Sequence, residues 1–114
     1  TADQRLNENS GESRDPAIAV DSSNNIYIVW SDHPFAPMGP WTFDLFYKKS
    51  ADGGATWTPD QRLTWTPCVS WSGPMGSGWP DFAIDSSGNL HIVWLDKPPQ
   101  QCNSEFEIYY KKGK

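Results

Sequence analysis

The sequence predicts an all-β protein made of two related units, and three observations support this fold class. Aromatic residues make up 14% of the 114 residues and include 7 Trp, which excludes a disordered acidic chain. No segment has the apolar spacing of an amphipathic helix. The chain also contains an internal repeat, and turn-forming residues divide each copy. The length suits one small domain.

The internal repeat extends over most of the chain. Three segments recur in the same order: DQRL at residues 3–6 and 60–63, AIAVDSSNNIYIVWSD at 17–32 and DFAIDSSGNLHIVWLD at 81–96, and FDLFYKK at 43–49 and FEIYYKK at 106–112. The longest pair is identical at nine of its sixteen positions. Self-similarity of this kind is typical of repeat architectures, in which each copy is one supersecondary unit.

Each copy of the repeat predicts β-strands. We expect strands at residues 16–21, 25–31, 43–50 and 57–64, and again at 81–85, 89–95 and 105–112. The segment IYIVW at 26–30 is β-branched and aromatic without polar alternation, as in a strand buried on both faces. The segments DSSNN at 21–25 and DSSGN at 85–89 are predicted hairpin turns. His91 replaces Tyr27 inside a strand, so we expect a packed or hydrogen-bonded side chain.

The first residues of the chain resemble the fourth strand of the first copy, since residues 3–6 match 60–63. We therefore predict one two-blade unit over 1–114, with an outer strand at 1–6, a four-stranded blade at 15–64 and three strands of a second blade at 79–112. Such an offset is how β-propellers close their rings. Natural rings hold roughly 4–8 blades, and two blades alone would expose apolar faces. We expect a homo-oligomer, with a trimer of six blades favoured over four chains with eight.

One motif resembles that of a known family. The segment SADGGATW contains Ser50, Asp52, Gly54, Thr56 and Trp57, and it matches every specified position of the Asp box, S-x-D-x-G-x-T-W, of sialidase-type (BNR) β-propellers. A carboxylate in such a turn can accept main-chain N–H groups, while glycine supplies the positive φ angle. The resemblance implies that these residues are structural and lie on the face of the propeller opposite the usual ligand site.

The loops at the other face carry the candidate ligand-binding residues. Alternating strand direction brings the loops at 7–15, 32–43, 65–79 and 96–105 to this face. Its candidate ligand-binding residues are Arg14, Asp32, His33, Trp41, Trp71, Trp79 and Asp96. Exposed aromatic rings beside hydrogen-bonding groups suit sugars, so we predict a non-catalytic, lectin-like protein that binds glycans. The alternative is that these Trp side chains only pack the long loops onto the rim.

An enzyme is the main rival among function classes. The resemblance to sialidases implies three Arg on the substrate carboxylate, a Tyr–Glu nucleophile pair and an Asp acid/base. Residues 13–16 (SRDP) are similar to the R-I-P signature of that family, with Asp15 in place of Ile. We expect Arg5 and Arg62, in outer strands, not to converge with Arg14. We therefore predict no catalytic residues, with a sialidase-like glycosidase or a protein-interaction scaffold as alternatives.

The two cysteines and the net charge bear on compartment and partners. Cys68 and Cys102 fall in loops of the same face, so we predict a disulfide and a secreted or cell-surface location. Neither has a second ligand at metal spacing, and we expect neither metal nor cofactor. A net charge of −5 argues against nucleic acid, and no apolar run approaches a membrane span. The lysine pairs at 48–49 and 111–112 are expected as solvated edge residues.

Overall fold

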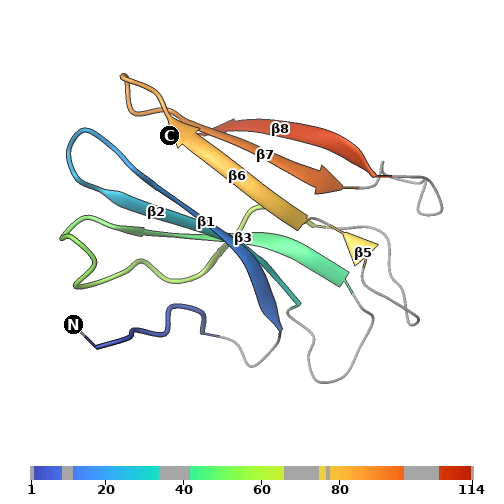
Figure 1. Ribbon diagram of the computed structural model, residues 1–114, viewed down its shortest axis with the longest axis horizontal. Helices are drawn as coiled ribbons and strands as arrows, with labels where there is room; N and C mark the ends of the chain where they lie inside the picture. The colour runs from blue at the N-terminus through green and yellow to red at the C-terminus, as the bar shows by residue number, and fades with distance from the viewer. Residues whose placement is uncertain are drawn as a thin grey trace.

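The protein consists of two antiparallel β-sheets packed face to face, which confirms the all-β fold class (Figure 1). The computed structural model describes residues 2–8, 12–33, 42–65, 75–76, 78–96 and 106–113. Over these ranges every regular element is a strand. No helix in the described ranges is long and apolar enough to cross a membrane.

The first sheet contains the N-terminal copy of the repeat. Its strands are β1 (Ser13–Val20), β2 (Ile26–Asp32), β3 (Thr42–Ser50) and β4 (Gln61–Arg62), in that spatial order, and β5 (Met75–Gly76) pairs in parallel with the start of β3. The outer strand is much shorter than the expected 57–64. Pro59 has no N–H to give to the ladder, although Thr58 and Leu63 still donate backbone hydrogen bonds to β3 on either side.

The second sheet contains the C-terminal copy and repeats the first sheet position by position. Its strands are β6 (Gly78–Ile84), β7 (Leu90–Asp96) and β8 (Glu107–Gly113), in antiparallel order. Trp30 lies opposite Phe46 in the first sheet, and Trp94 lies opposite Tyr109 in the second. The rings of the first pair stack at 6.2 Å and those of the second at 6.0 Å. The sequence repeat is therefore also a structural repeat.

The hydrophobic core lies between the two sheets. The first sheet contributes Tyr27, Val29 and Leu45, and the second contributes Phe82, Leu90, Ile92 and Trp94. Strand β6 packs across β1 and β2, so the innermost strand of the second sheet touches the first (Figure 1). Period-2 alternation explains the arrangement, because these core side chains occupy alternate positions of their strands.

The two predicted hairpin turns have the same hydrogen-bond pattern. One carboxylate oxygen of Asp21 accepts the N–H groups of Ser23 and Asn25, both at 2.9 Å. Asp85 repeats this with Ser87 and Asn89, also at 2.9 Å. The second carboxylate oxygen of each Asp forms a hydrogen bond with a side chain near the start of the following strand. This side chain is the Tyr27 hydroxyl in one copy and His91 Nε2 in the other, which explains how histidine replaces tyrosine there.

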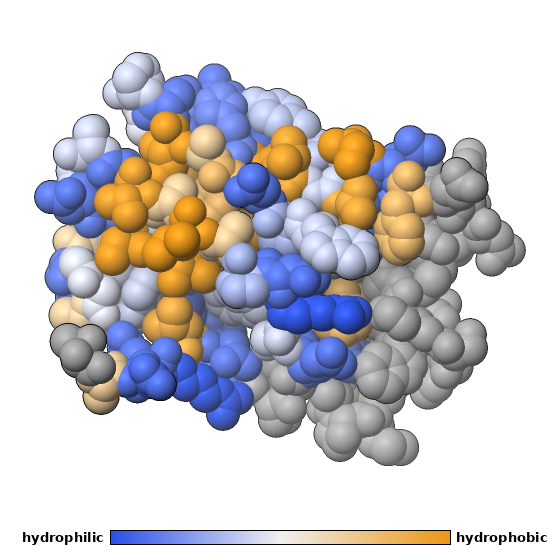
Figure 2. Space-filling model, viewed as in Figure 1, coloured by the Kyte–Doolittle hydropathy of each residue, from blue (hydrophilic) through white to orange (hydrophobic). Residues whose placement is uncertain are grey.

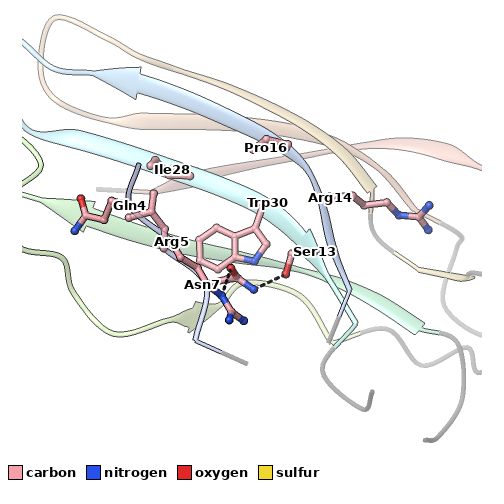
Figure 3. Close-up of a pocket in the computed structure, with 9 residues that line it drawn as sticks. Gln4, Arg5, Asn7, Ser13, Arg14, Pro16, Ile28 and Trp30 are labelled. Carbon is pink, nitrogen blue, oxygen red and sulfur yellow. Dashed lines mark hydrogen bonds between the residues drawn. The ribbon is translucent and has the colours of Figure 1, made fainter. Parts of the chain in front are cut away.

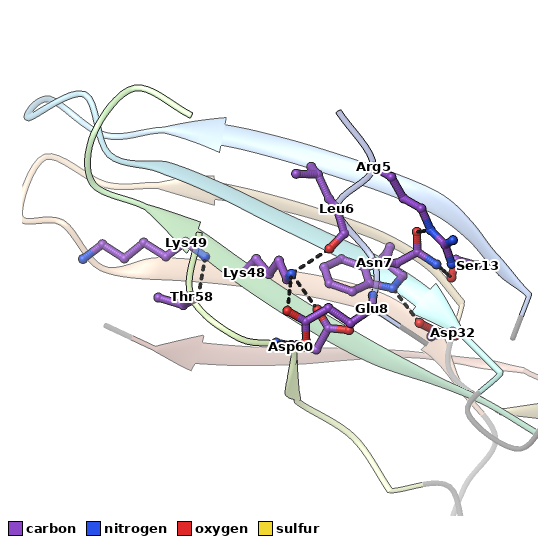
Figure 4. Close-up of polar contacts among 11 residues, drawn as sticks. Arg5, Leu6, Asn7, Glu8, Ser13, Asp32, Lys48, Lys49, Thr58 and Asp60 are labelled. Atoms are coloured by element: carbon purple, nitrogen blue, oxygen red, sulfur yellow. Dashed lines mark hydrogen bonds and ion pairs between the residues drawn. The ribbon is translucent and has the colours of Figure 1, made fainter. Parts of the chain in front are cut away.

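The N-terminal segment, residues 2–8, pairs with no strand in the described part of the chain, although residues 1–6 are expected as an outer strand. It lies beside β3, where Lys48 Nζ donates to the Leu6 carbonyl at 2.6 Å (Figure 4). The same ammonium lies 3.1 Å from Glu8 and 3.0 Å from Asp60. The expectation of a solvated Lys48 is wrong, since this residue is only 4% exposed. Three acceptors compensate for its burial.

Candidate functional site

The turns and the candidate ligand-binding residues lie at opposite ends of the sheets. The turns at 21–25 and 85–89 and the Asp-box turn lie at the left of Figure 1, while β1 and β6 both begin toward the right. Of the predicted binding residues, the structure places Arg14, Asp32, His33, Trp79 and Asp96 at the second end. Trp41, Trp71, Cys68 and Cys102 lie outside the described residues.

The first strand of each sheet begins with a β-bulge. The register shifts between Arg14 and Ala17 in β1, and between Gly78 and Asp81 in β6. Asp15 has φ of 56° and Trp79, its repeat equivalent, has φ of 45°. A bulky residue in this left-handed region is strained, and bulges of this kind re-aim side chains near functional sites. The Trp79 side chain is 65% exposed.

Arg14 is held in place by an aromatic ring. Its guanidinium carbon lies 4.0 Å from the centroid of the Phe43 ring, while the side chain remains exposed. The His33 ring packs against the same Phe43 at 5.7 Å between centroids and is 3% exposed. The backbone N–H of His33 donates to the Glu12 carbonyl at 2.8 Å, which joins the end of β2 to the start of β1. Phe43 thus fixes the direction of the arginine charge.

Trp79 and Arg14 are placed at the same end of the molecule by a shared neighbour. Arg14 pairs with Ser31 in the first sheet. Gly78 lies against the same serine, since a Cβ at position 78 would be 3.8 Å from Ser31 Oγ. The start of β6 therefore lies near the start of β1, which places Trp79 and Arg14 at the same end of the two sheets. Figure 3 shows Arg14 directed away from Trp30 and the N-terminal segment.

The two predicted carboxylates have a supporting role at this end. Asp32 accepts the indole N–H of Trp30 at 2.9 Å, and Asp96 accepts that of Trp94 at 3.3 Å. Asp32 is fully buried, while Asp96 is partly exposed. Each carboxylate satisfies the one donor of a buried tryptophan, two residues before it in the strand. Of the predicted binding residues, the structure therefore brings together Arg14 and His33 on the Phe43 ring, while Asp32 precedes His33 at the end of β2.

Sequence reasoning missed a second polar cluster on the outer edge of the first sheet. The fully buried Asp44 accepts hydrogen bonds from the Arg62 guanidinium and, at 2.9 Å, from the Thr64 hydroxyl. The Arg62 guanidinium also lies 5.7 Å from the ring of Trp65, which is 68% exposed. The recurrence of an arginine in both DQRL segments was the available signal, because Arg5 is the repeat equivalent of Arg62.

Several internal hydrogen bonds hold the Asp-box turn. Asp52 accepts the backbone N–H of Thr56 at 2.8 Å and also the Thr56 hydroxyl. The Ser50 hydroxyl donates to Asp52 at 2.8 Å and accepts from the N–H of Gly54, whose φ is 96°. The hydrogen bonds from Thr56 and Ser50 lower the pKa of Asp52 to about 2. Such a carboxylate, ionised and fully engaged in its own turn, supports a structural role.

The site has no metal-binding set in the part of the chain that the structure describes, because no three His, Cys, Asp or Glu side chains gather there. Arg5 donates to Asn7, and Arg62 contacts Asp44, the Thr64 carbonyl and the Trp65 ring. No protein-family model matches the chain, and no curated protein matches it either. The candidate site therefore consists of the exposed Trp79 ring and the Arg14 guanidinium on Phe43, with Asp32 buried at the end of β2.

Proposed function

We propose that the two sheets are adjacent blades of a β-propeller and that the end carrying Arg14 and Trp79 binds carbohydrate without catalysis. The observation that supports this proposal best is the strained backbone at Trp79, which presents a largely exposed indole at the end of the sheets where Arg14 packs on Phe43. Strain of this kind is retained where the side chain it presents has a function.

The two side chains suit a sugar with a negative charge. The exposed face of an indole is an apolar surface on which the C–H groups of a pyranose ring can stack. A guanidinium has donors arranged to bind a carboxylate through two parallel hydrogen bonds. Because the Arg14 charge is already oriented by Phe43, less side-chain entropy is lost when a ligand binds. We therefore infer an acidic monosaccharide as the preferred ligand.

The arrangement of the carboxylates favours binding over hydrolysis. Glycoside hydrolysis commonly needs two carboxylates in different environments, one acting as an acid and the other as a base or nucleophile. Asp32 and Asp96 instead accept the indole N–H groups of buried tryptophans, and they do so equivalently in the two sheets. A sialidase-like enzyme, a ring of three chains, the Cys68–Cys102 disulfide and secretion all stay predictions.

The experiment is isothermal titration of sialic acid, as the acidic sugar, and galactose, as a neutral one. We expect sialic acid to bind more tightly. Trp79→Ala should weaken binding of sialic acid by about two- to tenfold, the loss of one stacked ring. Arg14→Met keeps the stem over Phe43 and removes the charge, so it should abolish the preference for the acidic sugar. Trp65→Ala is the matched control, because Trp65 is as exposed as Trp79 but lies beside Arg62.

Three results would contradict the proposal. Absence of binding by the unaltered chain at millimolar sugar would exclude a carbohydrate site of useful affinity. An equal loss in Trp65→Ala would show that binding does not depend on the position of Trp79. Turnover of a fluorogenic sialoside that disappears in Arg14→Met would assign the protein to the enzymes.

A further inference from the structure

The outward faces of the two sheets reproduce the two halves of the core between them. The inner half from the first sheet contains Val29, Leu45 and Tyr47, whose equivalents on the outward face of the second sheet are Val93, Ile108 and Tyr110. The inner half from the second sheet contains Phe82, Ile84, Ile92, Trp94 and Tyr109, whose equivalents on the outward face of the first sheet are Ile18, Val20, Ile28, Trp30 and Phe46. The chain therefore carries two copies of each half of this interface. One copy of each half forms the core between the sheets, and the other copy lies on an outward face.

Both outward faces are apolar and carry exposed side chains, although Trp30 on the first sheet is only 5% exposed. Ile18 is 65% exposed and Val20 is 55% exposed on the first sheet. Ile108 is 72% and Tyr110 58% exposed on the second. Figure 2 shows apolar side chains gathered over the left half of the view, over the turn ends of β1 and β2. Contiguous exposed apolar surface of this kind marks an interaction site.

The N-terminal segment contacts the first sheet in the same way as Leu63, just after β4, contacts the second sheet. Lys48 Nζ donates to the Leu6 carbonyl at 2.6 Å, and its equivalent Lys111 donates to the Leu63 carbonyl at 3.1 Å. Leu6 and Leu63 are themselves repeat equivalents. Residues 2–7 thus occupy the place of an outer strand that belongs to a preceding sheet.

A hollow marks where that preceding sheet would insert. It has a volume of about 330 Å³, and Gln4, Leu6, Ile28 and Trp30 are among its lining residues (Figure 3). The equivalent hollow beside the second sheet is smaller, at about 180 Å³, and Tyr47 of the first sheet closes one side of it. Among the described lining residues of the larger hollow, none takes the place of Tyr47. Its repeat equivalent is Tyr110, which is exposed on β8.

The charges along the two free edges are complementary in the same register. Within the first sheet, Arg62 pairs with Asp44, and Asp60 lies 3.0 Å from Lys48. The equivalents of these two pairs are Arg5 with Glu107, and Asp3 with Lys111. All four side chains of the second set are exposed in the single chain. The N-terminal segment thus carries Asp3 and Arg5, and β8 carries Lys111 and Glu107, which have the opposite charges.

We propose that a second copy of this chain docks on the outward face of the first sheet, with its β8 pairing antiparallel to residues 3–7. The register follows β3 and β4, where Phe46 lies opposite Arg62 and Tyr47 opposite Gln61. Arg5 then meets the partner's Glu107 and Asp3 meets the partner's Lys111, while the partner's Tyr110 enters the hollow. The contact joins two different surfaces, so it repeats from copy to copy and closes into a ring when the rotation allows. The proposal rests on the blade assignment, and its test measures association and not carbohydrate binding.

The test is a charge-reversal cycle followed by sedimentation velocity at about 1–100 μM, the range in which specific interfaces of moderate affinity dissociate. The unaltered chain should sediment as a multiple of 12.8 kDa. Arg5→Glu and Glu107→Arg each place like charges opposite one another and should weaken association at least about tenfold. The combined variant R5E/E107R restores opposite charges and should recover affinity to within about threefold of the original.

Glu12→Arg is the matched control, because it makes the same charge change at an exposed residue outside this contact, and it should leave the sedimentation unchanged. Far-ultraviolet circular dichroism reports whether each variant is folded. A single chain of 12.8 kDa at every concentration overturns the proposal. Association that both single reversals leave intact, or that the combined variant fails to restore, overturns the stated register. Sugar titration of the dissociated variants separates this failure from failure of the proposed function.

Discussion

The buried ammonium of Lys48 offers a quantitative test of how the N-terminal segment is held. Burial acts to lower the pKa of Lys48, but hydrogen bonds to Asp60 and Glu8 outweigh it, so the pKa is raised. In Lys48→Met the apolar stem is kept, whereas the Leu6 carbonyl and Asp60 lose their partner (Figure 4). The change therefore removes the charge and the three contacts while leaving the packing of the strand almost intact.

The expected loss follows from the exposure of each partner. Removing one member of a buried ion pair costs about 3–5 kcal/mol. Glu8 is 60% exposed, so its share is small, and Asp60, whose side chain is 13% exposed, regains some hydration. The unpaired Leu6 carbonyl adds about 1 kcal/mol. We expect the free energy of unfolding to fall by about 2–3 kcal/mol and the melting temperature by about 10 °C.

The assay is urea and thermal unfolding of dilute protein, with Lys111→Met as the matched control. Lys111 occupies the equivalent position in the second sheet, but its side chain is exposed and its described contact is the Leu63 carbonyl alone. The control should lose about 0.5 kcal/mol, as expected for one exposed hydrogen bond. An equal loss in the two variants, or a loss below about 1 kcal/mol for Lys48→Met, would refute this account of the segment.

Two further predictions concern the turn and the strained site. In the unaltered chain, Asp52 has a lowered pKa of about 2 in the folded state, so its contribution to stability is present above its ordinary value of 3.8 and is lost as the pH falls through about 2. Asp52→Asn should remove this acid-dependent component in unfolding measured from pH 5 to 2, and an unchanged pH profile would contradict the turn assignment. Trp79→Gly relieves the positive φ of 45°, so thermal unfolding should show no loss of stability and a gain of up to about 1 kcal/mol. The same variant should lose sugar binding, and a marked loss of stability would show that Trp79 is there for packing.

The fold was predictable from local signals because the repeat supplies them twice. Turn chemistry at Asp21 and Asp85 requires only residues within four positions of each carboxylate. The strand pattern of 26–30 likewise needs no knowledge of its neighbours. The short β5 was missed, because a parallel pair between Met75 and Thr42 depends on a contact far apart in sequence, and its Met-Gly segment has no strand propensity.

The site was predictable only in part, for the same physical reason. Arg14 and Trp79 were predicted from the composition of their loops, but the orientation of Arg14 depends on Phe43, which reaches it across the sheet. The sequence predicts Asp32 and Asp96 as ligand-binding residues, but in the structure each accepts a hydrogen bond from the indole N–H of a nearby tryptophan. Lys48 and Lys111 lie in similar local sequences, FDLFYKKS and FEIYYKKG, and it is the long-range contacts with Glu8 and Asp60 that distinguish the buried Lys48.

Hydrogen exchange at the Leu6 amide tests most directly whether the outward face of the first sheet is covered by another copy. The repeat-equivalent amide of Leu63 donates to the Leu45 carbonyl at 2.7 Å. The account predicts that the Leu6 amide donates to Ile108 of the partner subunit, is protected at high protein concentration and loses that protection on dilution or in Arg5→Glu. Exchange of Leu6 at the rate of an unprotected amide at every concentration would contradict it.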